Sequence, residues 1–108
     1  MVKQGDIIKL NLNPKKGHEQ QGYRPYICLS HDIISQTSNI AVFAPISNTM
    51  RNYPFYVPLK NTQTAGKVLL DQLVTVDYNA RSYTFVETID DYLLDELLMK
   101  VKAVFQKN

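Results

Sequence analysis

The sequence is poor in the residues that bind metals or cross-link chains, with one cysteine, two histidines and no tryptophan among 108 residues. A single cysteine excludes a disulfide within the chain and is compatible with a reducing cytoplasm. The chain contains no Cys-x-x-Cys and no His-Glu-x-x-His motif, so no zinc site is recognisable and we expect no metal cofactor. A magnesium ion held by carboxylates alone stays open at this stage.

Long apolar runs are also missing. No stretch approaches the ~20 apolar residues that a membrane-spanning helix needs. The first residues alternate between polar and apolar side chains and contain no hydrophobic block followed by a cleavage site, which argues against a signal peptide. We therefore expect a cytoplasmic protein without membrane contact.

A strong excess of either charge is absent as well. The chain has 12 basic and 10 acidic residues, a net charge of +2 and a pI near 8.7. Proteins that bind nucleic acid through their overall field are usually more basic, with a pI above about 9. A nucleic acid partner would therefore have to be bound by a local cationic surface.

The composition that remains, 44% hydrophobic and 20% charged, is that of one globular domain spanning residues 1–108. Ile8, Leu10 and Leu12 alternate with polar residues, which predicts a first, half-buried strand. Residues 31–39 are expected to form an irregular connector, with Asp32 as a cap for a short helical turn. Further strands are predicted at 26–30, 40–46, 53–59, 67–77 and 83–87, and the two prolines in 53–59 place that strand at an edge or a bulge.

Near the C-terminus the apolar spacing changes to three and four residues, which predicts an amphipathic helix. Thr88 and Asp91 resemble a capping box at its start. The predicted fold is mostly β with a C-terminal α-helix, as a small antiparallel barrel or curled sheet that the helix caps. The apolar stripe of the helix consists of Leu93, Leu94, Leu97, Leu98, Val101, Val104 and Phe105.

The most specific motif lies between the first two strands. Residues 14–24 form a long polar loop, and loops of this length inside a compact domain tend to be functional or mobile. From Gly17 to Pro25 the chain reads GHEQQGYRP, which resembles the G-x-E-Q-x-G-x-R-P signature of the MazF/PemK toxin family. Other family segments match in the same order at Gly5-Asp6-Ile7, Asn11-Leu12-Asn13-Pro14, Pro45-Ile46-Ser47, Tyr53-Pro54-Phe55, Asp71-Gln72 and Thr75-Val76-Asp77.

The resemblance covers roughly residues 5–105 and has clear implications. It implies an SH3-like curled barrel that works as a homodimer. It implies a metal-independent endoribonuclease, an mRNA interferase, which cuts single-stranded RNA at a short sequence by attack of the ribose 2′-hydroxyl. The products would carry a 2′,3′-cyclic phosphate and a 5′-hydroxyl. It also implies a cognate antitoxin whose disordered acidic segment silences the toxin.

Cleavage of this kind needs a base, an acid and donors for the charge that builds on phosphorus. Arg24 falls on the family's essential arginine, and its guanidinium can bind two phosphate oxygens at once. Ser47 takes the place of the family's catalytic threonine, unless it only accepts hydrogen bonds from loop amides. His18, which the PemK branch shares, and Glu19 are the candidate proton carriers. Which of them is base and which is acid stays open. Alternatively, His18 is a solvated loop residue, and Glu19 orients Arg24 or organises the loop by accepting hydrogen bonds from backbone N–H groups.

A second set of residues is expected to bind the RNA, because aromatic rings stack on unpaired bases and cations contact phosphates. The PemK branch has a catalytic arginine two residues before its aspartate. That position is Leu69 here, so the chain follows the MazF pattern and Asp71 is structural or positions RNA. The predicted substrate-binding residues are Lys16, Gln20, Tyr23, Asn48, Thr49, Arg51, Tyr53, Asp71 and Arg81.

Two alternatives to an active ribonuclease stay open. Gyrase-poisoning toxins share the fold without cutting RNA, but they act through a C-terminal helix that contains tryptophan, and this chain has none. The other alternative is a family member that has lost activity, since serine replaces threonine at Ser47.

Overall fold

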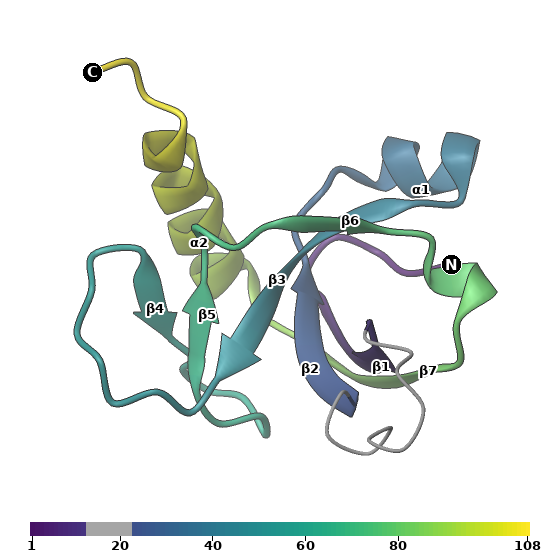
Figure 1. Cartoon of the computed structure of the whole chain (residues 1–108), viewed down its shortest axis with the longest axis horizontal. Coiled ribbons are helices and arrows are strands. Elements are labelled where there is room, and N and C mark those ends of the chain that lie inside the picture. The colour runs from purple at the N-terminus through teal and green to yellow at the C-terminus, as the bar shows by residue number, and fades with distance from the viewer. Residues whose placement is uncertain (13–22) are drawn as a thin grey trace.

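The computed structural model of the chain describes residues 1–12 and 23–108 (Figure 1). It confirms a mostly β fold with a C-terminal helix. The strands are β1 (Asp6–Asn11), β2 (Tyr23–Cys28), β3 (Ala41–Ser47), β4 (Tyr56–Pro58), β5 (Lys67–Leu69), β6 (Val74–Val76) and β7 (Tyr83–Thr88). The helices are α1 (Asp32–Ser38), the 3-10 turn η2 (Tyr78–Ala80) and α2 (Asp91–Val104). None of the helices in the described ranges has the length and apolar character needed to cross a bilayer.

The strands form one antiparallel sheet in the order β4-β5-β3-β2-β1-β7, with β6 paired to β3 beside this path. β3 pairs with β6 through residues 41–43 and with β5 through its last two residues, so it carries the sheet around a bend. Over residues 1–12 and 23–108 the sheet is strongly curled but not closed, so of the two predicted forms the curled sheet is the one observed. β4 and β7 stay at its two ends, and Pro58 in β4 lacks the N–H group that a further ladder would use.

The two faces of the sheet bury two separate apolar clusters. One cluster lies under α2 and joins Ile7 and Ile27 of the sheet to Leu93 and Leu97 of the helix. The other lies on the opposite face and is closed by the N-terminal segment and η2, with Tyr78 almost fully buried. Its other buried members are Val2, Ile8, Leu10, Tyr26, Cys28, Ala41, Phe43 and Val76. Alternating residues of β1 and β2 therefore contribute to different cores.

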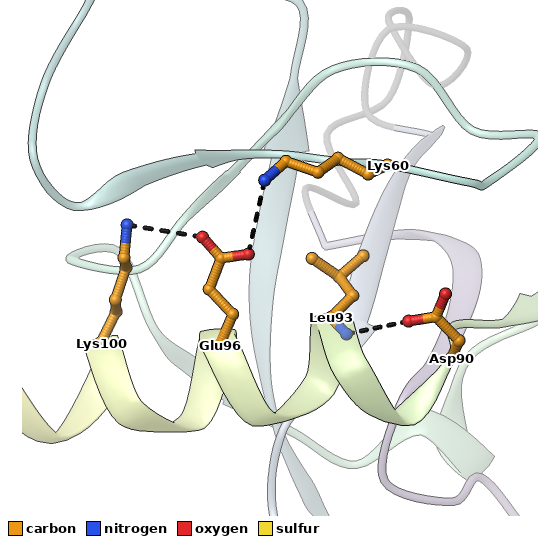
Figure 2. A network of polar contacts seen from close by, with 5 residues as sticks. All are labelled: Lys60, Asp90, Leu93, Glu96 and Lys100. Atoms are coloured by element: carbon orange, nitrogen blue, oxygen red, sulfur yellow. Dashed lines mark hydrogen bonds and ion pairs between the residues drawn. The ribbon is translucent and has the colours of Figure 1, made fainter.

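The start of α2 differs from the predicted capping box. Asp90 is the N-cap, and its carboxylate accepts a hydrogen bond from the Leu93 backbone N–H at 2.8 Å (Figure 2). Thr88 instead ends β7 and donates its hydroxyl to buried Asp6. Further along α2, Glu96 forms ion pairs with Lys100 on the next turn and with Lys60 after β4, which Figure 2 also shows.

Other differences concern short elements. The strand predicted at 67–77 is divided by a turn into β5 and β6. The division follows from the pairing, because β5 pairs with the end of β3 and β6 pairs with its beginning. The strand predicted at 53–59 shrinks to β4, since prolines flank or occupy it. The connector at 31–39 contains the full helix α1, and its N-cap is His31 with Asp32 as first helical residue.

Candidate functional site

Arg24 and Ser47 lie at the same end of the sheet and on the same face. β2 and β3 pair with Tyr26 opposite Pro45. The ladder ends at this pair, and two residues further along each strand the alternation puts Arg24 on the face of Tyr26 and Ser47 on the face of Pro45, which is the same face. Ser47 itself pairs with Lys67 of β5, and Figure 1 shows β3 diverging from β2 at this end. The two candidate catalytic residues therefore flank the point where the strands separate.

Two guanidinium groups converge near this point. Arg81 donates from Nη1 to the Asn11 carbonyl at the end of β1, at 2.9 Å. Burial raises the pKa of the Tyr26 phenol, and the charges of Arg24 and Arg81 oppose that rise. Two cations that act on one phenol must both lie near it. Two cationic side chains therefore act on this face, and cations of this kind are what a phosphate-binding surface requires.

The Ser47 hydroxyl organises the loop that follows it. Its oxygen accepts a hydrogen bond from the Thr49 backbone N–H at 3.2 Å, and the Thr49 hydroxyl oxygen accepts one from the Arg51 N–H, also at 3.2 Å. Serine and threonine often stabilise turns in this way. The loop-organising interpretation of Ser47 is therefore confirmed. It is compatible with a second role, because a hydroxyl that accepts one hydrogen bond still has its own proton to donate.

The loop presents a cation stacked on aromatic rings. The Arg51 guanidinium carbon lies 4.6 Å from the centre of the Tyr53 ring and 5.8 Å from that of Tyr56. The two tyrosine rings are 4.9 Å apart at an angle of 64°. Arg51 is exposed and both tyrosines are half-buried, so the stack stands at the surface beside Ser47. Surfaces of this kind bind nucleotides through charge and stacking.

The structure brings some of the predicted residues together and separates others. Strand alternation places Tyr23 on the opposite face from Arg24, and its hydroxyl forms a hydrogen bond with that of Thr84. Asn48 is exposed directly after Ser47, and Asp71 is exposed in the turn after β5. The other predicted residues, Lys16, His18, Glu19 and Gln20, lie outside the described residues.

Side chains of the metal-binding types do not cluster in residues 1–12 and 23–108. No group of three or more histidine, cysteine, aspartate and glutamate side chains there is placed to hold a metal ion. Asp77, the acidic residue before η2, accepts a hydrogen bond from the Ala80 backbone N–H and caps that turn. The described part of the site consists of cations, hydroxyls and aromatic rings, which are the groups that bind phosphates and bases.

Sequence reasoning missed Lys67 and Tyr56. Lys67 donates from Nζ to the Arg51 carbonyl at 2.8 Å and to the Asn52 side-chain oxygen at 3.4 Å. The Gln72 amide donates to the Tyr56 hydroxyl at 3.3 Å. Alternation along 67–69 shows that Lys67 leaves the core face, but only the pairing of β5 with β3 puts it next to Ser47.

Comparisons with known proteins identify the family of the chain. Residues 3–105 match the model of a family described as the PemK-like, MazF-like toxin of type II toxin-antitoxin systems. The endoribonuclease toxin ChpB of Escherichia coli K12 is 33% identical, over 94% of this chain and 92% of that protein. The endoribonuclease toxin MazF of the same strain is 29% identical, over 93% of this chain and 90% of that protein. Both of these relatives are named endoribonucleases, so the non-catalytic, gyrase-poison alternative is not favoured.

Solved structures of related toxins have the same architecture. MazF from Deinococcus radiodurans superposes with a TM-score of 0.79 at 27% identity, over 94% of each chain. A MazE-MazF structure from the same organism has a TM-score of 0.82 at 24% identity, also over 94% of each chain, and supports the fold. The match of the family model to nearly the whole length shows that the chain belongs to the PemK-like, MazF-like toxins of type II toxin-antitoxin systems.

Proposed function

We propose that this endoribonuclease toxin cuts single-stranded RNA at a short sequence, without a metal ion, on the face that carries Arg24 and Ser47. One observation carries the proposal. The arginine of the family signature and the hydroxyl that replaces the family's threonine come from two paired strands, and strand alternation beyond the pair of Tyr26 and Pro45 supports a common face for them. The charge of Arg81 acts on the same face.

The proposed reaction uses the nucleophile that RNA supplies. The ribose 2′-hydroxyl loses its proton to a base and attacks phosphorus, while the bond from phosphorus to the 5′ oxygen breaks. An acid protonates that oxygen, so the products are a 2′,3′-cyclic phosphate and a 5′-hydroxyl. Arg24 binds the phosphate oxygens and Ser47 donates its hydroxyl proton to them, which stabilises the added charge. His18 and Glu19 are the proposed proton carriers.

The test compares the wild-type protein with Arg24→Ala on a long unstructured RNA in EDTA, with mapping of the fragment ends. We expect discrete cuts with cyclic phosphate ends from the wild type. The variant should be slower by on the order of a hundredfold or more, because a charged transition-state contact is lost. Circular dichroism should show that the variant is folded. Equal cutting by both proteins, or none by the wild type, would refute the proposal.

We also propose that a cognate antitoxin binds this chain and lays an acidic segment over the same cationic face. Relatives support the idea, since one solved neighbour is an endoribonuclease in complex with its cognate antitoxin. The charges of Arg24 and Arg81 suit an acidic peptide as well as RNA. RNA and antitoxin should therefore compete. If RNA bound unchanged at saturating antitoxin, the shared face would be wrong.

Finally, we propose that two copies of the chain associate, as the family resemblance implies. Large apolar side chains are exposed on the single chain, among them Tyr92 at 86%, Phe105 at 72% and Met99 at 67%, all from α2 or its C-terminal end. Such exposure often marks a contact with another protein. Sedimentation velocity should give the mass of a dimer, and a monomer at micromolar concentration would contradict this.

A further inference from the structure

We propose that Lys67 is a positioning residue that holds the loop 48–52, and with it the Arg51 cation, beside the cleavage site. The inference rests on the proposed function, because it concerns how that site binds RNA. It starts from the position of β5, which lies between β3 and β4. Lys67 is directly opposite Ser47 on one side and Pro58 on the other. Directly opposed residues share a face, so Lys67 is a near neighbour of Ser47.

The loop is tied to the sheet by consecutive hydrogen bonds. At its start, Ser47 accepts from the Thr49 N–H, and Thr49 accepts from the Arg51 N–H. At its far end, Lys67 donates from Nζ to the Arg51 carbonyl and to the Asn52 side chain. The loop thus begins after Ser47, and its other end is attached by Lys67, the residue that pairs with Ser47. Lys67 therefore supplies the hydrogen bonds that attach the far end of the loop to β5.

The backbone around Lys67 is itself fixed against Ser47. Gly66 has φ +126°, a conformation that L side chains rarely adopt. A Cβ atom at Gly66 would lie 2.7 Å from the Ser47 carbonyl oxygen, so the two backbones approach more closely than any other residue type allows. The backbone position of Lys67 is therefore well defined, and its contact with the Arg51 carbonyl depends on the conformation of the Lys67 side chain.

Holding the loop has a consequence for the RNA-binding surface. The Arg51 backbone that Lys67 binds carries the guanidinium stacked on Tyr53. The attachment of the loop therefore keeps the Arg51 cation where it favours binding of an anionic strand. A loosened loop would bind substrate less well, while the phosphate chemistry at Arg24 would be unaffected.

The experiment measures KM and kcat on an RNA oligonucleotide that carries the cut site mapped for the wild type. Lys67→Met keeps the length of the side chain and removes the ammonium. We expect KM to rise by roughly tenfold, as for the loss of one or two hydrogen bonds, with kcat nearly unchanged. Lys67→Arg should restore most of the affinity, because it keeps donors and charge. Lys60→Met is the matched control, since Lys60 pairs with Glu96 of α2 and should leave both constants unchanged.

A double-mutant cycle with Arg51→Ala separates positioning from direct contact. If Lys67 acts through Arg51, the double variant should lose little more than Arg51→Ala alone. Fully additive losses would mean that Lys67 contacts RNA independently, and would overturn the proposal. An unchanged KM in Lys67→Met, with normal cutting by the wild type, would also overturn it. If the wild type cut no RNA at all, it is the proposed function that would fail, so the two failures are distinguishable.

Discussion

At the residue scale, the site depends on single polar groups with more than one task. Ser47 shows this most clearly, because its oxygen accepts from the Thr49 N–H while its proton is available for a phosphate oxygen. A threonine has the same hydroxyl and an extra methyl group. The serine is therefore a conservative replacement in hydrogen bonding, and it gives no physical reason for a loss of activity.

Substitution of Ser47 tests both tasks. Ser47→Thr should cut RNA at least as fast as the wild type, because the donor and the loop acceptor are retained. Ser47→Ala should lower kcat by on the order of a hundredfold, as for loss of one transition-state donor. Thr49→Val removes only the next hydrogen bond of the loop and should act mainly on KM. Loss of cutting in Ser47→Thr would show that the assignment of this position is wrong.

At the element scale, α2 covers one face of the sheet and leaves the other face to the site. Its apolar stripe supplies Leu93 and Leu97 to the core beneath it. The helix begins at Asp91 because Asp90 satisfies a backbone N–H that would otherwise have no partner. The cap contributes to stability and lies on the face of the sheet away from Arg24.

Substitutions at the start of α2 distinguish the observed cap from the predicted one. Asp90→Ala should lower the free energy of unfolding by about 1 kcal/mol, because the N-cap hydrogen bond is lost. Asp91→Ala should cost less, since Asp91 lies in the first turn, where a carboxylate interacts favourably with the helix dipole, and does not make the N-cap hydrogen bond. Urea denaturation measures both, and KM for RNA should not change in either. A larger cost for Asp91→Ala would favour the capping box over the observed N-cap.

At the scale of the whole molecule, a side chain bridges the two ends of the open sheet. Glu87 lies in β7 and accepts hydrogen bonds from the backbone N–H groups of Gln63 and Thr64, at 3.0 and 2.8 Å, and from the Thr64 hydroxyl. These residues belong to the connection between β4 and β5, at the other end of the strand order. The curled shape is therefore held by a carboxylate where no strand pairing closes it.

This bridge makes stability depend on pH. Burial alone would raise the Glu87 pKa, but the three hydrogen bonds outweigh it and the pKa is lowered. The stabilisation is thus fully present above the usual glutamate value of about 4.3 and is lost as pH falls through the lower pKa of the folded protein. Glu87→Gln should reduce stability at neutral pH and weaken its decline in acid. Urea midpoints between pH 7 and about pH 3 would show this, and parallel curves for both proteins would contradict it.

The sequence by itself predicted most of the strands, the C-terminal helix and the candidate site residues. Period-two alternation predicted the first strand, short apolar runs predicted the strands at the centre of the sheet, the spacing of leucines predicted α2, and the signature ending at Arg24 and Pro25 indicated the family. These signals are local, because each depends on residues that are neighbours along the chain.

The tertiary structure alone decided which distant residues meet. The pairing of β2 with β3 brings Arg24 to the face of Ser47, and the pairing of β3 with β5 adds Lys67, which no local pattern indicated. It also placed Tyr23 on the other face, beside Thr84, and it gave Thr88 a hydrogen bond to Asp6 in place of a capping role. The described strands form an open sheet. Strand order and register are set by the packing of whole elements, and the sequence contains no local signal for either.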